Sequence, residues 1–156
     1  MTTPMVVATG VVVTERPQTV ASAGLGALER DAIVLTAEER RWGRRRVRTV
    51  RGREVVLALA TGTVLQPGEV LHVADGWYLA VEAAKEALLA LRPRTQEEAL
   101  RVAFEVGNRH FTLALDGGRL LVPDDPAMVQ LLGRLGVVFE RTRAVFTPLG
   151  PGHRHD

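Results

Sequence analysis

Four histidines are the side chains of this sequence with the clearest potential for metal chemistry. His153 and His155 form a His-x-His pair, and their imidazole nitrogens can bind one ion of Zn, Cu or Ni. His110 follows a predicted helix, where a Gly107 C-cap and a turn are the simpler interpretation. His72 has no second ligand nearby in the sequence, so we expect a surface or packing residue. A site made of a loop histidine and a mobile tail would be open and exchangeable, which is typical of a carrier rather than a catalyst.

The residue types of the common catalytic sites are scarce. The absence of cysteine excludes disulfides, Cys-based zinc sites, iron–sulfur clusters and thiol nucleophiles. Ser22 is the only serine, and the chain has neither a Gly-rich phosphate loop nor a Gly-x-Ser-x-Gly motif. The pair Asp124 and Asp125 is better explained by the favourable position of negative charge at a helix N-terminus. We therefore expect that the protein is not an enzyme.

The composition is typical of a folded soluble protein. Of the 156 residues, 46% are hydrophobic and 24% are charged, unlike the composition of disordered chains. The apolar run 5–13 is too short to cross a membrane and lacks the basic leader of a secretory signal. We therefore expect a cytoplasmic protein without a membrane partner, and the lack of cysteine agrees with a reducing compartment.

Positive charge is concentrated in one stretch. Nine of the 19 arginines lie between Arg30 and Arg53, which gives the stretch through Glu54 a net charge of +5, against +2 for the chain. Residues 44–53 are typical of two strands around a turn at Arg51-Gly52, with arginines on an exposed face. Such a face can be merely solvated, or it can bind an acidic protein or nucleic acid.

The elements that position these side chains fall into two halves. In the first half, a Val-rich strand at 6–13 and an apolar strand at 55–60 are accompanied by frequent glycine and proline turns. This pattern predicts a small β-rich domain, which we place at residues 1–84.

Two helices and a hairpin are predicted in the second half. Thr95 and Glu98 form a capping box at the start of the first helix. The apolar stripe expected to bury one face of that helix comprises Leu100, Ala103, Phe104 and Gly107. A β-hairpin follows, with strands at 111–115 and 120–122. The second helix starts at Asp125 and Pro126, ends at a left-handed Gly136, and buries Met128, Leu131, Leu132 and Leu135.

The segment 79–91 gives conflicting signals. Its Ala, Leu, Glu and Lys content favours a helix by propensity. A strand at 87–91, however, would complete a ferredoxin-like βαββαβ order with a last strand at 137–145. The overall prediction is therefore an α+β protein: a β-rich domain, a ferredoxin-like domain at residues 85–149, and a short flexible tail from Leu149 onwards, chiefly residues 150–156.

Six short motifs are spread in order over nearly the whole chain. They occupy residues 31–46, 62–65, 68–71, 107–110, 120–125 and 146–148. Together they resemble the urease nickel metallochaperone family, urease accessory protein E.

This resemblance implies a homodimer of two-domain protomers, each with a peptide-binding-like N-terminal domain and a ferredoxin-like metal-binding domain. It implies that His110, which matches the histidine of the family's Gly-Asn-Arg-His motif, meets its symmetry mate at the dimer interface. One position beside a two-fold axis supplies two ligands. The tail histidines His153 and His155 are the matching candidates to complete or feed that site.

The resemblance also implies the function: nickel insertion during urease maturation, with the apo-urease complex and the urease accessory GTPase as partners. Residue types alone do not separate Ni(II) from Zn(II) or Cu(II). The chain departs from the family in having two tail histidines, where many members have a long His-rich tail. It also has Asp124, Asp125 and Pro126 where some members have histidines. Neither nickel storage nor an auxiliary site is therefore expected.

The alternative function is an RNA-binding module that uses the Arg44–Arg53 patch. Base stacking needs exposed aromatic side chains on the ferredoxin-like sheet. The second half contains only Phe104, Phe111, Phe139 and Phe146 and no Arg-Gly-Phe-type signature. We therefore do not expect a nucleic-acid partner, and we interpret the patch as a docking face for a protein.

Overall fold

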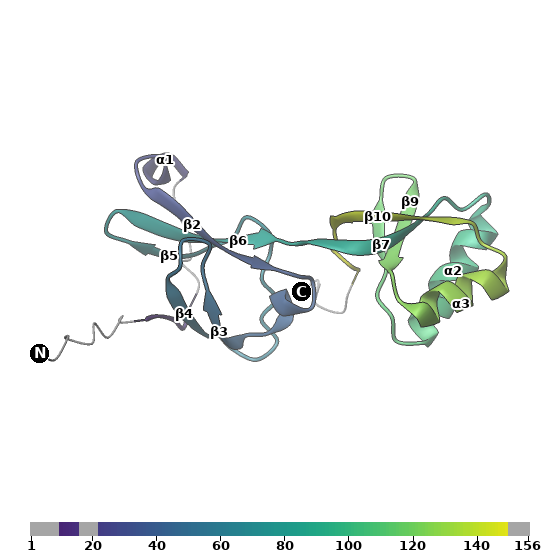
Figure 1. Cartoon of the computed structure of the whole chain (residues 1–156), viewed down its shortest axis with the longest axis horizontal. Helices are drawn as coiled ribbons and strands as arrows, with labels where there is room; N and C mark the ends of the chain where they lie inside the picture. The colour runs from purple at the N-terminus through teal and green to yellow at the C-terminus, as the bar shows by residue number, and fades with distance from the viewer. Residues whose placement is uncertain (1–9, 16–21, 150–156) are drawn as a thin grey trace, which may run out of the picture. The chain divides into compact units, whose positions relative to one another are not determined.

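The computed structural model describes residues 10–15 and 22–149. The chain divides after Ala83 into two compact units, an N-terminal and a C-terminal one. Helices and strands are numbered in chain order, as in the labels of Figure 1. The predicted strand residues 6–9 and the predicted tail 150–156, with His153 and His155, lie outside the described residues. Among the residues that are described, no helix is both long and apolar enough to span a membrane.

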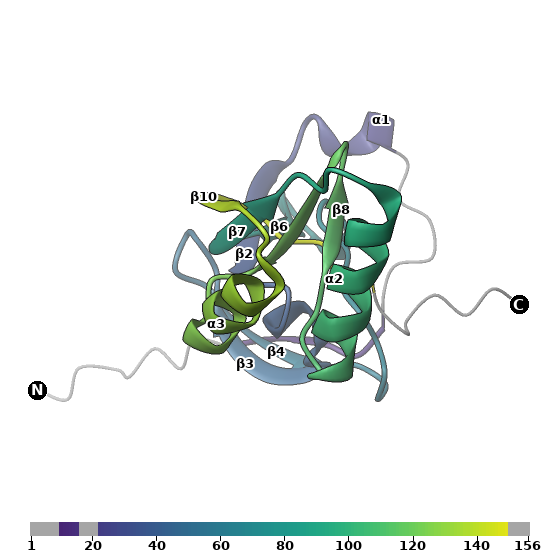
Figure 2. The ribbon, with the colours of Figure 1, turned by 90° about the vertical axis from the view of Figure 1, so that its right-hand side faces the viewer.

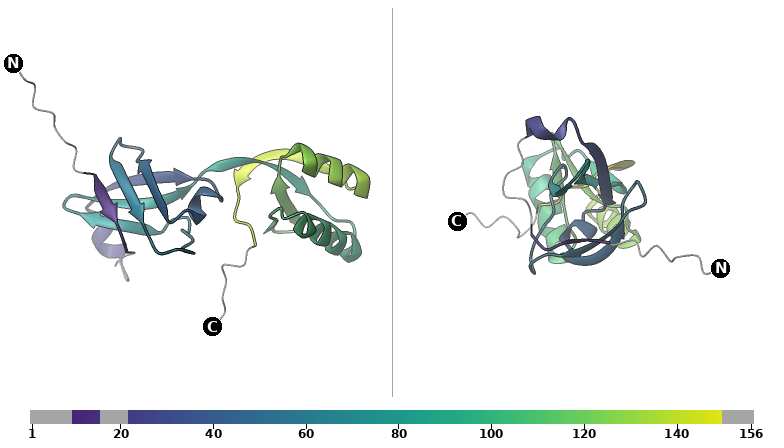
Figure 3. Two further views of the ribbon diagram at one scale, coloured as in Figure 1. Left: turned by 90° about the horizontal axis from the view of Figure 1, so that it is seen from below. Right: turned by 90° about the vertical axis from the view of Figure 1, so that its left-hand side faces the viewer.

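The N-terminal unit contains two three-stranded sheets. One has the order β1 (Val11–Val13), β4 (Glu54–Ala58) and β3 (Arg44–Arg48), and the other has the order β2 (Glu29–Leu35), β6 (Trp77–Ala83) and β5 (Val70–Ala74). Figure 3 shows the strands of this unit in purple to teal. The inward side chains of both sheets share one core, which includes Val13, Ile33, Val55, Leu57, Leu79 and Val81. A short helix α1 (Ser22–Leu25) and a 3-10 turn η1 (Glu39–Arg41) complete the unit.

The arginine-rich hairpin is confirmed. Strands β3 and β4 are antiparallel, with Arg48 opposite Glu54. Gly52 has a φ of 89°, which suits glycine at the turn. Arg44, Arg46 and Arg48 are exposed, as predicted, whereas Arg45 is half-buried on the opposite side of the strand.

A buried carboxylate joins this hairpin to strand β2. Asp31, which is 1% exposed, accepts hydrogen bonds from the Thr49 hydroxyl at 2.6 Å, the Arg53 guanidinium at 2.9 Å and the Arg51 amide at 3.1 Å. Burial acts to raise the pKa of Asp31, but these bonds and one from the Ala32 amide outweigh burial and lower the pKa below its usual value of 3.8. The ionised carboxylate therefore stabilises the packing of the hairpin against β2.

The C-terminal unit has the ferredoxin-like order strand–helix–strand–strand–helix–strand. Its elements are β7 (Lys85–Leu91), α2 (Gln96–Asn108), β8 (Ala114–Asp116), β9 (Arg119–Pro123), α3 (Pro126–Leu135) and β10 (Phe139–Val145). The antiparallel sheet has the order β10-β7-β9-β8, and the two helices lie side by side against it (Figure 2). The α+β class, the hairpin and the last strand are confirmed.

Segment 79–91 is strand throughout, apart from Ala84, so its helical propensity is overridden. Residues of β7 pair with β10 on one side and with β9 on the other. Leu88, Leu89 and Leu91 are at most 1% exposed. A central strand that is buried on both faces is continuously apolar, which is why composition alone resembles a helix there.

The two helices differ in the outcome of the prediction. In α3, Asp125 is the N-cap, Pro126 is the first residue and Gly136 is left-handed with a φ of 69°, as predicted. The predicted stripe of α3 is buried at Met128, Leu131 and Leu132. In α2, Thr95 caps the helix as predicted, but the Glu98 carboxylate accepts from the Arg94 amide rather than from that of Thr95.

The buried face of α2 was predicted wrongly. Val102 and Val106 face the core, whereas the predicted stripe lies on the opposite side of the helix. Leu100 is 63% exposed and Phe104 is 69% exposed. Alpha-helical spacing identifies residues that share a face, but α2 has two apolar faces, and spacing does not show which one packs on the sheet.

Candidate metal-binding site

His110 lies immediately beyond α2 in a conformation that is uncommon for its residue type. Its φ is 61°, and it is the only non-glycine residue with positive φ among residues 10–15 and 22–149. The left-handed region is strained for side chains with a Cβ, although histidine enters it more often than most residues. His110 is exposed to solvent.

The end of α2 holds His110 in this conformation. The His110 amide donates to the Gly107 carbonyl at 3.0 Å, and the Phe111 amide donates to the Val106 carbonyl at 3.1 Å. This pair of bonds is a Schellman motif, with His110 at the position that glycine usually occupies. Phe111 packs against the buried cluster that contains Val106, and a hydrophobic contact of this kind commonly accompanies the motif.

The predicted Gly107 C-cap is therefore wrong, because Gly107 lies inside the helix and Arg109 is the C-cap. Sequence analysis missed the left-handed His110. A usable signal was present: Val106 and the apolar Phe111 occupy the two positions that contact each other across a Schellman motif.

The last described residue, Leu149, is hydrogen-bonded to the segment that follows this histidine. The Leu149 amide donates to the Leu113 carbonyl at 2.8 Å. Leu113 is three residues beyond His110 and precedes β8, which lies at the opposite edge of the sheet from β10. Residues 146–149 therefore run from one edge of the sheet to the other. Leu149 is thus tied to the fold, and the prediction of a tail that is mobile from Leu149 onwards is wrong at its first residue.

The other described histidine, His72, belongs to the N-terminal unit. His72 is half-buried on β5, with its ring centroid 5.7 Å from that of Trp77, which confirms it as a packing residue. Among residues 10–15 and 22–149, no three histidine or carboxylate side chains gather to hold a metal ion. His110 therefore belongs to no such group of three within the described part of a single chain.

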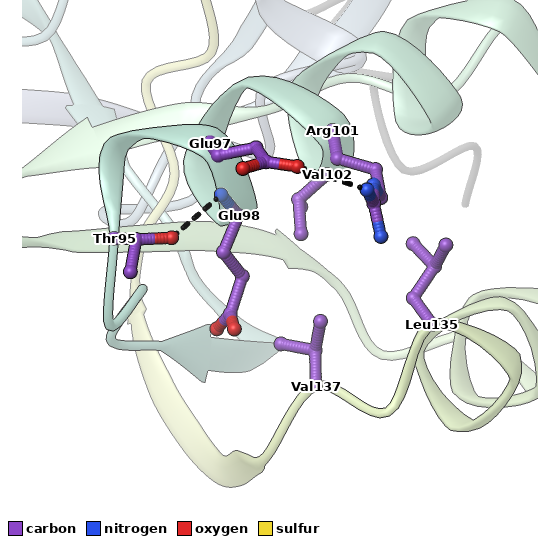
Figure 4. Close-up of a pocket in the computed structure, with 7 residues that line it drawn as sticks. All are labelled: Thr95, Glu97, Glu98, Arg101, Val102, Leu135 and Val137. Atoms are coloured by element: carbon purple, nitrogen blue, oxygen red, sulfur yellow. Dashed lines mark hydrogen bonds and ion pairs between the residues drawn. The ribbon is translucent and has the colours of Figure 1, made fainter.

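The N-terminal end of α2 carries a small hollow of about 160 Å³. Figure 4 shows its lining, in which Glu97 pairs with Arg101 and Thr95 caps the helix. This hollow lies at the other end of a 13-residue helix from His110, about 20 Å away along the axis. It has no histidine and is separate from the candidate site.

The fold and the site define a class: a two-unit α+β protein whose ferredoxin-like unit presents one exposed imidazole in an open position. Comparison with known proteins gives the family. The family description "UreE urease accessory protein, N-terminal domain" matches residues 13–84, and "UreE urease accessory protein, C-terminal domain" matches residues 86–156. The chain belongs to the UreE urease accessory protein family.

Individual relatives agree with this assignment. A urease accessory protein UreE of Synechococcus is 43% identical over 78% of this chain and 82% of its own length. One of Deinococcus radiodurans is 44% identical over 73% of this chain and 74% of its own. One of Burkholderia thailandensis is 42% identical over 67% of this chain, and the matched region spans about half, 51%, of that relative.

Family membership confirms the resemblance found in the sequence and agrees with a nickel metallochaperone role in urease maturation. An accessory protein fits the expectation of a non-enzyme that interacts with the urease-maturation machinery. The comparisons give no support to the RNA-binding alternative. The structure also gives no support to RNA binding by the sheet. Phe104, the exposed phenylalanine among the described residues, lies on the outer face of α2 rather than on the sheet.

Proposed function

We propose that the protein is a homodimeric carrier that binds Ni(II) between the His110 imidazoles of its two protomers and delivers it to apo-urease. The observation that carries this proposal is the exposed His110, held in a left-handed conformation at the end of a helix with an apolar outer face. Strain that is retained at an exposed ligand residue is typical of functional sites. Membership in the UreE family supplies the urease context.

The outer face of α2 supports a dimer. Leu100 and Phe104 share that face and are both more than 60% exposed. Exposed apolar side chains that gather on one helix face are typical of interaction sites. His110 follows Phe104 by six residues, about 9 Å along the helix axis, so a two-fold contact on this face would bring two copies of His110 near each other.

The tethering of Leu149 supports a contribution from the tail. His153 is four residues beyond Leu149, a reach of at most about 14 Å, and His110 is three residues from Leu113, at most about 11 Å. His153 or His155 can therefore reach His110 and act as a third, exchangeable ligand. Such a ligand suits a carrier, because it lets the ion leave without disruption of the fold.

Imidazole ligands define the chemistry of loading and release. They suit nickel, zinc and copper, so selection of Ni(II) over Zn(II) and Cu(II) comes from supply and from the partners, the apo-urease complex and the accessory GTPase, in the cytoplasm. Imidazole binds a metal only in its neutral form. Affinity therefore falls as the pH is lowered, and we expect nickel release at about pH 5. Equal retention at pH 5 and at neutral pH in a dialysis assay would contradict histidine ligation.

A calorimetric Ni(II) titration tests the site. The intact protein is compared with His110→Ala, a chain that ends at Leu149, and the matched control His72→Ala, while molecular mass is measured in parallel. We expect about one nickel per dimer, no binding by His110→Ala, weaker binding by the shortened chain and unchanged binding by His72→Ala. Full binding by His110→Ala would refute the site and leave the tail as the principal ligand.

A further inference from the structure

The arginines of the N-terminal unit differ in whether an acidic side chain accompanies them. Five of them lie 2.6 to 3.7 Å from a carboxylate of the same unit: Arg30, Arg45, Arg48, Arg51 and Arg53. The side chains of Arg44 and Arg46 are exposed and form no hydrogen bond or ion pair with any residue of 10–15 or 22–149. Their positive charge is therefore not neutralised within the described structure.

These two arginines lie on a sheet edge. Strand β3 is at the end of the order β1-β4-β3, so it is hydrogen-bonded only to β4 among the described strands. Arg44 and Arg46 are two residues apart on the outer face of β3, opposite Ala58 and Val56 of β4. Their Cβ atoms are thus about 7 Å apart along the strand. The other edge of β3 has backbone donors and acceptors available for a further strand.

We propose that this edge of β3 binds an extended acidic segment of a partner protein. The segment adds as a fourth strand, and its carboxylates at alternate positions lie directly opposite Arg44 and Arg46. Side chains that face each other on neighbouring strands have Cβ atoms about 5 Å apart, which is suitable for ion pairs. Backbone hydrogen bonds supply affinity, and the two arginines select the alternating acidic pattern.

The same surface is less suited to nucleic acid. Single-stranded nucleic acid binds through aromatic stacking and through many phosphate contacts. Trp42, which precedes β3 and is 46% exposed, has the Arg45 guanidinium 4.9 Å from its ring centre. One face of the indole is thus already covered. Two unpaired arginines on one strand supply few of the phosphate contacts that dominate such binding.

Fluorescence polarisation tests the proposal with three labelled probes. The first is a short synthetic peptide in which glutamate alternates with threonine, the second has the same composition with its glutamates contiguous, and the third is single-stranded oligouridine. The proteins are the full chain, Arg44→Glu/Arg46→Glu, the milder Arg44→Gln/Arg46→Gln, and the matched control Arg92→Glu/Arg134→Glu. The control makes the same change in charge at exposed positions of the C-terminal unit. Circular dichroism confirms that each variant is folded.

We expect the alternating peptide to bind, the charge reversal to weaken it at least about tenfold, and the control to change it less than about threefold. Amide hydrogen exchange across residues 44–48 should slow when that peptide is added, because new backbone hydrogen bonds form. Equal affinity for both peptides, unchanged binding after charge reversal, or preference for oligouridine would each overturn the proposal. Absence of any peptide binding would also overturn it and assign the arginines to protection of the edge against self-pairing.

Discussion

Helices α2 and α3 lie side by side in the same unit, yet they use their apolar residues differently. In α3 the apolar stripe packs into the core, with Leu132 fully buried, and the helix ends at the left-handed Gly136. In α2 two valines pack into the core, while Leu100 and Phe104 face solvent and the left-handed residue is His110. The single apolar face of α3 packs on the core. Helix α2 has a second apolar face, which is available for a second packing partner.

The C-terminal ends of the two helices also differ, and this difference supports the same distinction between α2 and α3. Glycine adopts positive φ without steric cost, so Gly136 needs no further explanation. Histidine at the same position of a Schellman motif is strained. The fold therefore retains a side chain that costs stability at the end of α2, the helix whose outer face is apolar. Both features are explained if α2 is a helix of an interface and α3 is a helix of the core.

The largest expected effect tests the two faces directly. Leu132→Ala leaves a cavity in the core and should lower the free energy of unfolding by about 3 kcal/mol. Leu100→Ala makes the same chemical change on the outer face of α2 and should cost less than about 0.5 kcal/mol. Urea denaturation followed by circular dichroism, at protein concentrations low enough to limit self-association, measures both. Equal losses would show that Leu100 is packed in solution and would remove the contrast.

This contrast marks the limit of what the sequence could predict. Local signals such as Thr95, Asp125, Pro126 and Gly136 identified the start of α2 and both ends of α3, because caps act within one turn of the chain. The end of α2 was placed wrongly at Gly107. The order of elements identified the strand at β7 against its own propensity. The packed face of α2 could not be found in this way, because two apolar faces satisfy the same periodicity and only the sheet distinguishes between them.

The candidate site was partly predictable for a similar reason. His110 could be singled out by the Gly-Asn-Arg-His motif that it ends. Its left-handed backbone depends on the hydrogen bonds from His110 to Gly107 and from Phe111 to Val106. The closeness of Leu149 to Leu113 depends on a path across the whole sheet. The Leu149–Leu113 contact joins residues far apart in sequence, so it follows from tertiary structure. The His110 backbone, in contrast, had a local signal in Val106 and Phe111.

The second prediction concerns the partner of the outer face. Phe104→Asp places a charge in the proposed dimer contact and should raise the dimer dissociation constant about a hundredfold, since a desolvated unpaired charge is costly. Analytical ultracentrifugation measures the change. Val138→Asp is the matched control, because Val138 is also an exposed apolar residue of the same unit, at 78%. If both variants dimerise like the parent, the outer face of α2 is not the interface.

A third prediction concerns the stability of the two units in acid, because the carboxylates with shifted pKa values lie outside the unit that contains α2 and α3. Asp31 and Glu39, whose pKa values are lowered, both belong to the N-terminal unit. Hydrogen bonds from the Thr36 amide and from Arg45 lower the pKa of Glu39, against the effect of burial. A carboxylate whose pKa is lowered in the folded state stabilises the fold at pH values above its usual pKa. This stabilisation is lost as the pH falls through the pKa of the folded state. The N-terminal unit should therefore lose stability as pH falls below 3.8, the usual value for Asp31.

Asp31→Asn tests this explanation. The substitution replaces the charged carboxylate, which accepts three hydrogen bonds from the hairpin, with a neutral amide. It should lower the free energy of unfolding at neutral pH by about 2 kcal/mol. It should also flatten the decline in acid, because the titrating group is gone. Thermal unfolding from pH 7 to pH 3 measures both, with the exposed Asp116→Asn as control. An acid decline as steep in Asp31→Asn as in the parent would assign it to other groups.

The smallest expected effect compares the two helix ends. His110→Gly removes the steric strain of a left-handed Cβ and should raise the free energy of unfolding by about 0.5–1 kcal/mol, while nickel binding is lost. Gly136→Ala introduces that strain at the end of α3, where φ is 69° and open space surrounds the glycine, and should lower stability by about 1 kcal/mol. Opposite signs in urea denaturation would show that α2 retains a destabilising residue for its ligand. A loss of stability in His110→Gly would instead mean that the imidazole supports the fold, and the strain at His110 would no longer distinguish the two helices.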